Sequence, residues 1–293
     1  MNYGPLVFLA AFFGLAASWF GLVMTPQIQL GRGQPETNIV SKSDLYPLSR
    51  PGVARQGLEV YRANGCAACH SQQISQTGIE INLLLVDIGT NPVAVVKALV
   101  AANVGVASAT PPSLAAGLPK TVARNLNVET AKAAVKALNS AGAKASVDLV
   151  LLGPDIARGW GQRRTVAADF LADDTVLLGS LRAGPDLANV GSRLPDVNWQ
   201  LKHLYAPRAV VPDSTMPSYR YLFERRKINR QPSLDALPKE IAPTEPGFEI
   251  VPTPEARALA AYLVSLRANV QLFETPMSLP PAPAAASTNS PAK

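Results

Sequence analysis

The pentapeptide Cys66-Ala67-Ala68-Cys69-His70 decides how the rest of the chain is interpreted. The 293 residues contain two cysteines and two histidines, and this segment holds three of those four side chains. A redox dithiol needs only the two cysteines, and a zinc site would need more ligands than remain elsewhere. A histidine directly after C-x-x-C indicates covalent haem attachment, with chance occurrence of the pattern as the remaining alternative. The sequence therefore predicts one covalent haem c, held by Cys66, Cys69 and His70.

The sixth position of the iron needs a second ligand. Of the four methionines, Met216 is the candidate, because it lies in a segment with prolines on both sides that would hold a weak thioether ligand rigidly. His203 is the alternative, and a bis-histidine site would have a lower potential than a His/Met site. The predicted metal ligands are therefore His70 and Met216, with His203 kept open in place of the methionine.

Further cofactor contacts are predicted between residues 179 and 193. A metal-binding histidine usually donates its second ring N–H to a fixed acceptor, and the carbonyl of Pro185 is the candidate here. Arg193 is a candidate partner for the haem propionates. Arg182, Trp199 and Arg208 are candidates for the same role, and each of the four can equally be a surface or structural residue.

An apolar segment begins close to the N-terminus. Pro5 to Met24 are 20 consecutive uncharged residues, and the first charged side chain is Arg32. A helix of that length spans about 30 Å of hydrocarbon. A cleaved signal peptide is the competing interpretation, but the segment has no basic start and exceeds a typical signal core. Because covalent haem attachment takes place outside the cytoplasm, we expect a single-pass anchor in the bacterial inner membrane, in contact with lipid, and a periplasmic haem domain.

The distribution of charged residues indicates which kinds of molecule the chain could bind. The formal charge is +6, and residues 158–230 hold 12 basic against 7 acidic side chains. A basic region of this kind suits anionic lipid, an acidic partner or haem propionates, although a solvated surface of mixed charge is an equally good interpretation. The arginines are not interleaved with stacking aromatics, so no nucleic-acid partner is expected.

Two helices are predicted near the two ends of the expected cytochrome c domain. One runs over 55–64, and the other follows Thr253, an N-cap residue with proline at the first helical position. Gly57 would allow a close helix crossing, with Tyr61 and Tyr262 filling the contact. The predicted domains are a transmembrane anchor (1–26), an extended tether (27–51), a cytochrome c domain (52–78 and 153–272), an inserted α/β domain (79–152), and a disordered or partner-wrapping tail (273–293).

The motifs resemble those of a known family. They are Leu58-Glu59-Val60-Tyr61 with Cys66 to Gln72; Gly179-Ser180-x-Arg182-x-Gly184-Pro185-Asp186-Leu187-x-x-Val190-Gly191-x-Arg193; and Trp199-x-x-x-His203-Leu204-x-x-Pro207-Arg208-x-Val210-Val211-Pro212-x-Ser214-x-Met216-Pro217-x-Tyr219. This set resembles the monohaem cytochrome c subunit (subunit II, FixO/CcoO-like) of cbb-type haem-copper cytochrome c oxidases. The resemblance covers Met1 to Gln73 and Gly159 to Glu224.

The resemblance implies a mainly α fold, with a class I-like cytochrome c domain behind one N-terminal transmembrane helix. It implies a non-catalytic subunit that relays electrons from a donor to a haem-copper catalytic subunit reducing oxygen, with other cytochrome c subunits as further partners. His70 and Met216 would be the axial ligands and Cys66 and Cys69 the attachment points. Leu187 joins Pro185 and Arg193 as an expected cofactor contact.

The chain departs from this family between Gly78 and Leu152. Alternating and helical apolar patterns predict a small α/β domain with the order βααβαβ. Its elements are strand 79–87, helix 92–102, an interrupted segment at Pro111 and Pro112, strand 120–126, helix 127–140 and strand 144–152. This order, and residues Pro119 to Ala143, resemble the C-terminal domain of the bacterial ribosomal stalk protein. Outside the cytoplasm, the expected use is docking or stability.

Two other functions stay open on the sequence alone. One is a free-standing membrane-anchored cytochrome c that shuttles electrons to some other acceptor. The other is a haem-based sensor or an assembly scaffold, in which the inserted domain binds the partner. Carbon monoxide binding distinguishes a haem-based sensor from the oxidase subunit and the shuttle, because a six-coordinate His/Met iron should resist carbon monoxide.

Overall fold

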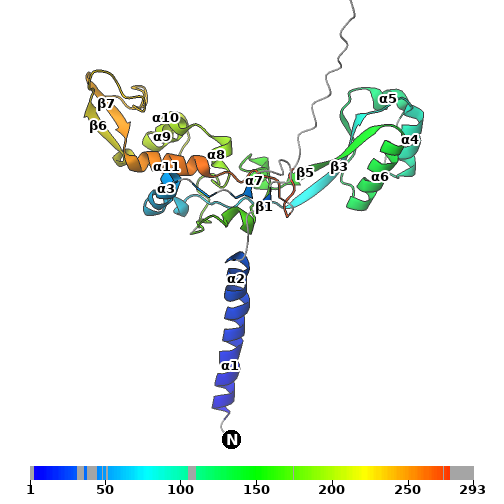
Figure 1. Cartoon of the computed structure of the whole chain (residues 1–293), viewed down its shortest axis with the longest axis horizontal. Coiled ribbons are helices and arrows are strands. Elements are labelled where there is room, and N and C mark those ends of the chain that lie inside the picture. Colours follow the sequence, from blue (N-terminus) through cyan, green and yellow to red (C-terminus); the bar gives the residue numbers. More distant parts are fainter. Residues whose placement is uncertain are drawn as a thin grey trace, which may run out of the picture. The chain divides into compact units, whose positions relative to one another are not determined.

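The computed structural model describes residues 3–31, 36–37, 45–47, 49–50, 52–104, 110–173, 175–272 and 274–277. These residues form two compact units (Figure 1). Unit 1 comprises the described parts of Met1–Ser75 and Gly159–Thr275, and unit 2 comprises those of Gln76–Arg158 with residues 276–277. Most of the predicted tail lies outside the described residues. The predicted assignment of residues 79–152 as an inserted domain stays a prediction.

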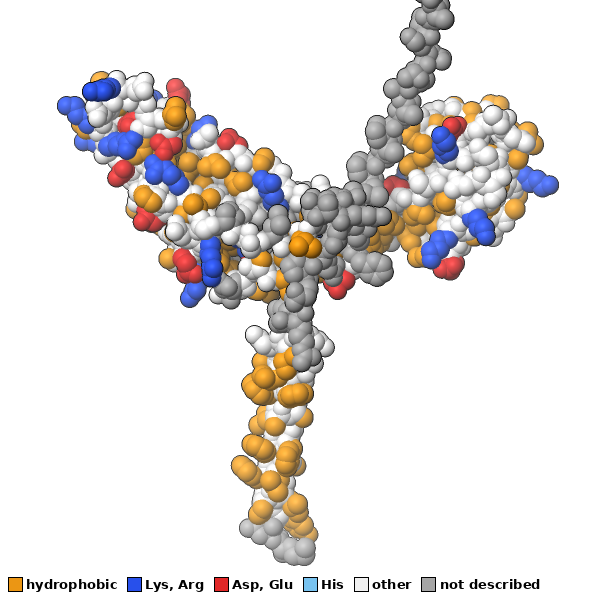
Figure 2. All heavy atoms as spheres, viewed as in Figure 1, with side chains coloured by type: hydrophobic (Ala, Val, Ile, Leu, Met, Phe, Trp, Pro, Cys, Tyr) orange, Lys and Arg blue, Asp and Glu red, His pale blue; other side chains and the backbone are white. Residues whose placement is uncertain are grey.

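The N-terminal segment is a continuous helix with outward-facing apolar side chains (Figure 2). It comprises α1 (Gly4–Trp19), a π-helical turn η1 (Phe20–Met24) and α2 (Thr25–Gly31). Within it, Gly4–Gln29 is long and apolar enough to cross a membrane, at roughly 39 Å for 1.5 Å per residue. The expected extended tether is wrong over its first residues, since the wider π-helical turn precedes Pro26 and lets the helix continue past this proline.

Two crossing helices form the centre of unit 1, as Figure 1 shows. They are α3 (Gly52–Ala63) and α11 (Pro254–Ser265), and the predicted Thr253 cap accepts a hydrogen bond from Ala256 N at 3.3 Å. At Gly57 an added Cβ would lie 1.9 Å from the carbonyl oxygen of Ala258, so only glycine fits this crossing. The rings of Tyr61 and Tyr262 lie 5.2 Å apart, which confirms the predicted contact.

Replacing Gly57 with alanine is expected to destabilise unit 1 by about 1–3 kcal/mol, the usual range for overpacking a filled core. The new methyl group would meet the Ala258 backbone and Tyr262 Cβ, neither of which can rotate away. Gly52→Ala, at the exposed start of the same helix, is the matched control, because nothing lies within 4 Å of its Cβ position. Denaturant unfolding of the full chain measures both variants, and equal midpoints would argue against the close crossing.

Shorter elements complete unit 1. The helices are α8 (Val190–Arg193), α9 (Val197–Tyr205) and α10 (Pro207–Val210), with 3₁₀ turns η2 (Cys66–Ala68), η3 (Ala167–Phe170) and η4 (Arg220–Leu222). The strands are β1 (Glu36–Thr37) with β2 (Leu45–Tyr46), and β6 (Phe223–Lys227) with β7 (Phe248–Pro252), both pairs antiparallel. The β1–β2 pair lies in the predicted tether, so two short extended segments of the tether run in opposite directions. One apolar core joins α3, α8, α9, β7 and α11.

A buried ion pair connects three distant segments of unit 1. Arg163 has no exposed surface and donates to both carboxylate oxygens of Asp169, at 2.6 and 3.0 Å. Its Nε donates to Val270 O at 2.6 Å, and the hydroxyl of Tyr46 donates to Asp169 Oδ1 at 2.7 Å. Burial and the Asp169 carboxylate raise the pKa of Tyr46, so its hydroxyl stays protonated. Because a buried charge without its partner is costly, this network favours one arrangement of the three segments.

Unit 2 is an α/β unit with the antiparallel strand order β4-β3-β5. Its elements are β3 (Gly78–Asp87), α4 (Pro92–Ala101), α5 (Pro111–Ala115), β4 (Lys120–Ala123), α6 (Val128–Ser140), β5 (Lys144–Leu152) and α7 (Pro154–Ala157). The core combines buried leucines and valines of β3, α4 and α6. The element order up to β5 follows the predicted βααβαβ, but β4 ends before 126 because Asn125 adopts a left-handed conformation at φ 51°.

Candidate functional site

The Cys66–His70 segment is a tight turn at the end of α3. Gly65, at φ 66°, ends the helix, and the 3₁₀ turn η2 follows with hydrogen bonds from Cys69 N and His70 N to Cys66 O at 3.2 and 3.0 Å. Both cysteines are free thiols, with Cys66 half-buried and Cys69 exposed. Burial raises the pKa of the Cys66 thiol to about 11, so it is protonated at neutral pH. The turn therefore presents two thiols and one imidazole within five residues.

A second segment, residues 178–187, holds this turn in place through four backbone hydrogen bonds. They run from Ser180 N to Ala67 O (3.1 Å), Gly184 N to Cys69 O (2.9 Å), Leu187 N to Ser71 O (2.8 Å) and Gln72 N to Leu178 O (2.9 Å). We call residues 178–187 the clamp segment. Its close approach needs glycine at position 179, where φ is 86° and a Cβ would lie 2.3 Å from His70 O. The clamp segment thus fixes the backbone on both sides of His70.

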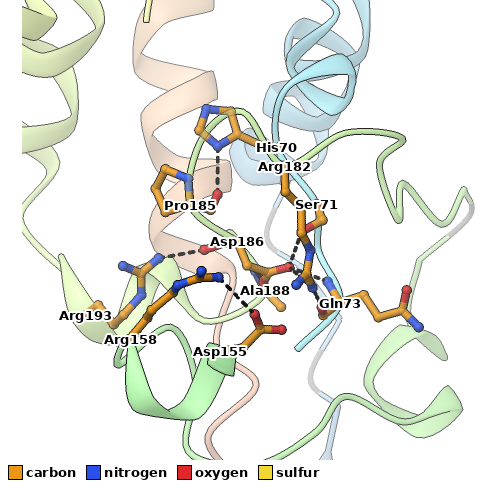
Figure 3. Close-up of polar contacts among 10 residues, drawn as sticks. All are labelled: His70, Ser71, Gln73, Asp155, Arg158, Arg182, Pro185, Asp186, Ala188 and Arg193. Atoms are coloured by element: carbon orange, nitrogen blue, oxygen red, sulfur yellow. Dashed lines mark hydrogen bonds and ion pairs between the residues drawn. The ribbon is translucent and has the colours of Figure 1, made fainter. Parts of the chain in front are cut away.

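The clamp segment also orients the His70 ring, as Figure 3 shows. Nδ1 lies 2.8 Å from the carbonyl oxygen of Pro185, the acceptor predicted from the sequence. Because a carbonyl can only accept, Nδ1 carries the proton and Nε2 keeps its lone pair for a ligand bond. A Cβ at Gly184 would lie 2.3 Å from the ring carbon Cε1, so glycine is required beside the imidazole. His70 is therefore presented with one defined nitrogen available.

Met216 lies in unit 1 with a half-buried side chain. It packs against the same apolar core as Cys66. The loop around it is fixed by hydrogen bonds from Ser214 N to Val211 O at 3.0 Å and from Met216 N to Ser214 Oγ at 3.3 Å. Arg208 Nε donates to Ser214 O at 3.2 Å, so this arginine supports the methionine loop from outside. The arrangement suits a thioether ligand held in one conformation.

His203 belongs to the same region. Its ring stacks on Trp199 with the centroids 4.8 Å apart, and its Nδ1 is buried. Burial and, second, the charge of His70 lower the pKa of His203, so the ring is neutral at pH 7. A neutral imidazole is the form that binds metals. His203 therefore stays the alternative to Met216.

The other predicted contacts lie around the clamp segment. Leu187 is buried in the core of unit 1. Arg193 donates from Nη2 to the backbone oxygen of Asp186 at 2.6 Å, and burial lowers its pKa. Arg182 donates to Ser71 Oγ at 3.0 Å and lies over the ring of Trp160 at 5.9 Å. Arg182 is thus a component of the clamp, whereas a propionate contact for it stays a prediction.

The side chains of this region fit a haem c. Arg193 Nε and His203 Nδ1 are buried and have no hydrogen-bond partner in the part of the chain that the structure describes. A buried polar atom without a partner costs about 1–3 kcal/mol, so each of these two nitrogens indicates a place where an acceptor group binds. The propionates of a haem are groups of this kind. No group of three or more His, Cys, Asp and Glu side chains that could hold a metal ion is found among the described residues.

Asp186 and Ser71 belong to the site but were not predicted from the sequence. Asp186 has no exposed surface, and its Oδ2 accepts from Ser71 Oγ at 2.6 Å and from Gln73 N at 2.7 Å. Both residues stand in the motifs that resemble the oxidase subunit, but those motifs alone assigned them no role. Its burial depends on segments more than 100 residues apart, so local patterns could not reveal it.

Residues 154–240 match the family model described as Cytochrome C oxidase, mono-heme subunit/FixO. The match covers less than a third of the chain and includes the clamp segment and Met216, but not Cys66 to His70. It supports the predicted similarity to this oxidase subunit and the cytochrome c class of the fold. A search of curated proteins returned no match. The predicted resemblance of unit 2 to the ribosomal stalk protein gains no support.

Proposed function

We propose that this chain is the mono-haem, electron-transferring subunit of a membrane-bound cytochrome c oxidase. The observation that carries the proposal is the His70 arrangement: two free thiols lie in one turn with an imidazole whose Nδ1 is bound to Pro185 O at 2.8 Å. The family match over residues 154–240 supports the same function. The chain would accept single electrons from a donor and deliver them to a haem-copper catalytic subunit that reduces oxygen.

The residues have separate tasks in this proposal. When bound, a haem c supplies one-electron redox chemistry at its iron. Cys66 and Cys69 would attach it through thioethers, and His70 Nε2 would be the first axial ligand. Pro185 O holds the ring orientation and raises the basicity of Nε2. Met216 would be the second ligand, which favours a higher potential than a second histidine would give.

The remaining parts of the chain would place this site in the membrane system. The apolar helix Gly4–Gln29 would anchor the chain in the bacterial inner membrane, in contact with lipid. Unit 1 would then lie on the periplasmic side, because covalent haem attachment takes place outside the cytoplasm. Unit 2 would be an inserted docking or stabilising domain. Other cytochrome c subunits would complete the complex.

Purification of the tagged full chain from mildly solubilised membranes tests the proposal. We expect about one covalent haem per polypeptide and co-purification of a polytopic haem-copper subunit that consumes oxygen. Membranes from cells with an untagged chain are the control. A monodisperse cytochrome without partners would favour the free-standing shuttle, and rapid carbon monoxide binding to the reduced protein would favour a sensor; either result would contradict the oxidase subunit.

A further inference from the structure

Asp186 is a fully buried carboxylate next to the residue that orients His70. Beyond its bonds to Ser71 Oγ and Gln73 N, its Oδ1 accepts from Ala188 N at 2.8 Å. The side chain thus holds two of the residues that follow His70, Ser71 and Gln73, and also Ala188, which follows the clamp segment. All of these contacts lie within unit 1, and Figure 3 shows the carboxylate between the two segments.

The backbone carbonyls of Pro185 and Asp186 also have hydrogen-bond partners. The preceding carbonyl, Pro185 O, lies 2.8 Å from His70 Nδ1, and the carbonyl of Asp186 itself accepts from Arg193 Nη2 at 2.6 Å. Any shift of Asp186 would therefore move the acceptor of the His70 ring. The carboxylate fixes the position of the Pro185 carbonyl without touching the imidazole.

A neutral side chain could make part of this network, so hydrogen bonding alone does not account for a charge at position 186. The ion-pair partner in the described structure is Arg182, whose Nη2 lies 3.7 Å from Oδ2 and whose side chain is 35% exposed. Arg182 also donates to Ser71 Oγ at 3.0 Å, which couples the two charges to the residue after His70. A partly exposed cation at this separation balances a buried carboxylate incompletely. Arg193 is a second cation that interacts electrostatically with Asp186. The two arginines offset part of the Asp186 charge, so removing this charge makes the field at the His70 imidazole more positive.

We propose that Asp186 is a positioning residue for His70 whose buried negative charge lowers the reduction potential of the haem. This inference rests on the proposed function. The oxidised iron carries one positive charge more than the reduced iron, so a nearby negative charge stabilises the oxidised form. The same charge holds Pro185 O against Nδ1, and a stronger donor bond from the ring also favours the oxidised form. Both effects therefore lower the reduction potential of the haem.

Four variants of the full-length holoprotein separate charge from packing. Asp186→Asn removes the negative charge, Ser71→Ala removes one hydrogen bond and keeps the charge, and Arg182→Gln removes one of the two compensating cations. Glu249→Gln is the matched control, because Glu249 is a buried carboxylate that accepts from Ser233 Oγ (2.6 Å), Ser233 N (2.8 Å) and Arg226 Nε (2.9 Å). It lies on β7, and its hydrogen-bond partners Ser233 and Arg226 are outside the clamp segment.

Redox titration of each variant gives the decisive measurement. At an effective dielectric constant of about 20, loss of the Asp186 charge should raise the reduced-to-oxidised ratio at fixed potential about tenfold, a shift of about 59 mV. Ser71→Ala should raise the potential less, Arg182→Gln should lower it, and Glu249→Gln should leave it unchanged. A purely structural role would give Asp186→Asn and Arg182→Gln shifts of the same sign.

Haem content, measured as the pyridine haemochrome, distinguishes a failure of the proposed function from a failure of the role proposed for Asp186. A wild-type chain without covalent haem would overturn the proposed function. A haem-loaded wild type with equal potentials for Asp186→Asn and Glu249→Gln would overturn only the role of Asp186. Should Asp186→Asn fail to fold, Arg182→Gln carries the test alone, because a rise or no change of its potential contradicts the proposal.

Discussion

A chain in which Cys66 and Cys69 are both replaced by serine is expected to lose all covalently bound haem. The two residues are the only cysteines of the protein, so no other thiol can form a thioether. Each single variant should keep one linkage, with Cys66→Ser more disruptive because Cys66 packs against the core while Cys69 is exposed. The measurement is haem staining of the denatured chain and extraction with acidified organic solvent.

Ala68→Ser is the matched control for this experiment. Ala68 is an exposed residue of the same 3₁₀ turn, so the variant adds a hydroxyl there without removing a thiol. It should keep its full haem content. Pigment that stays with the double serine variant, or that leaves the wild-type chain in acidified solvent, would show that the sulfurs do not hold the group.

Replacing Met216 with alanine is expected to abolish the methionine-to-iron charge-transfer band and to lower the reduction potential. The thioether stabilises reduced iron, so its loss should lower the reduced-to-oxidised ratio at fixed potential by more than about tenfold, or 59 mV for one electron. The opened position should also let the reduced protein bind carbon monoxide. Absorption spectra and a redox titration measure these effects, with Met277→Ala as the control outside the proposed site.

His203 gives the alternative outcome of that experiment. If the imidazole of His203 is the sixth ligand, Met216→Ala should leave the spectrum unchanged, and His203→Gln should open the iron instead. The stacking of His203 on Trp199 with a buried Nδ1 fits a contact with the edge of a haem as well as a ligand. Comparing the two variants assigns the ligand directly.

Local signals predicted those parts of the structure that depend on a few neighbouring residues. The Cys66–His70 motif, the Thr253 cap followed by proline, and the alternation in unit 2 each depend on geometry within one or two turns. The Gly57 crossing and the tyrosine pair could be predicted because a glycine on an apolar helix face favours the close approach of a second backbone. The His70 to Pro185 hydrogen bond could be anticipated because metal-binding histidines need a partner for their second nitrogen.

Features that depend on distant residues could not be predicted in this way. The Arg163–Asp169 pair joins Tyr46 and Val270, which are separated by more than 200 residues, and nothing in its local sequence marks it as buried. The tether was predicted to begin at residue 27, whereas the helix follows a π-helical turn and continues to Gly31. Asp186 was missed because its burial requires the clamp segment to be in place.

The pairing of the first and last strands of unit 2, β3 and β5, has a consequence for how this protein can be altered. Gly78 lies opposite Leu152, and Thr77 N donates to Leu152 O at 2.8 Å, so the chain leaves and returns at adjacent points. A segment whose two ends lie next to each other can be inserted, deleted or replaced without displacing the flanking polypeptide. An epitope or fluorescent reporter grafted between these two points should therefore leave a working electron carrier.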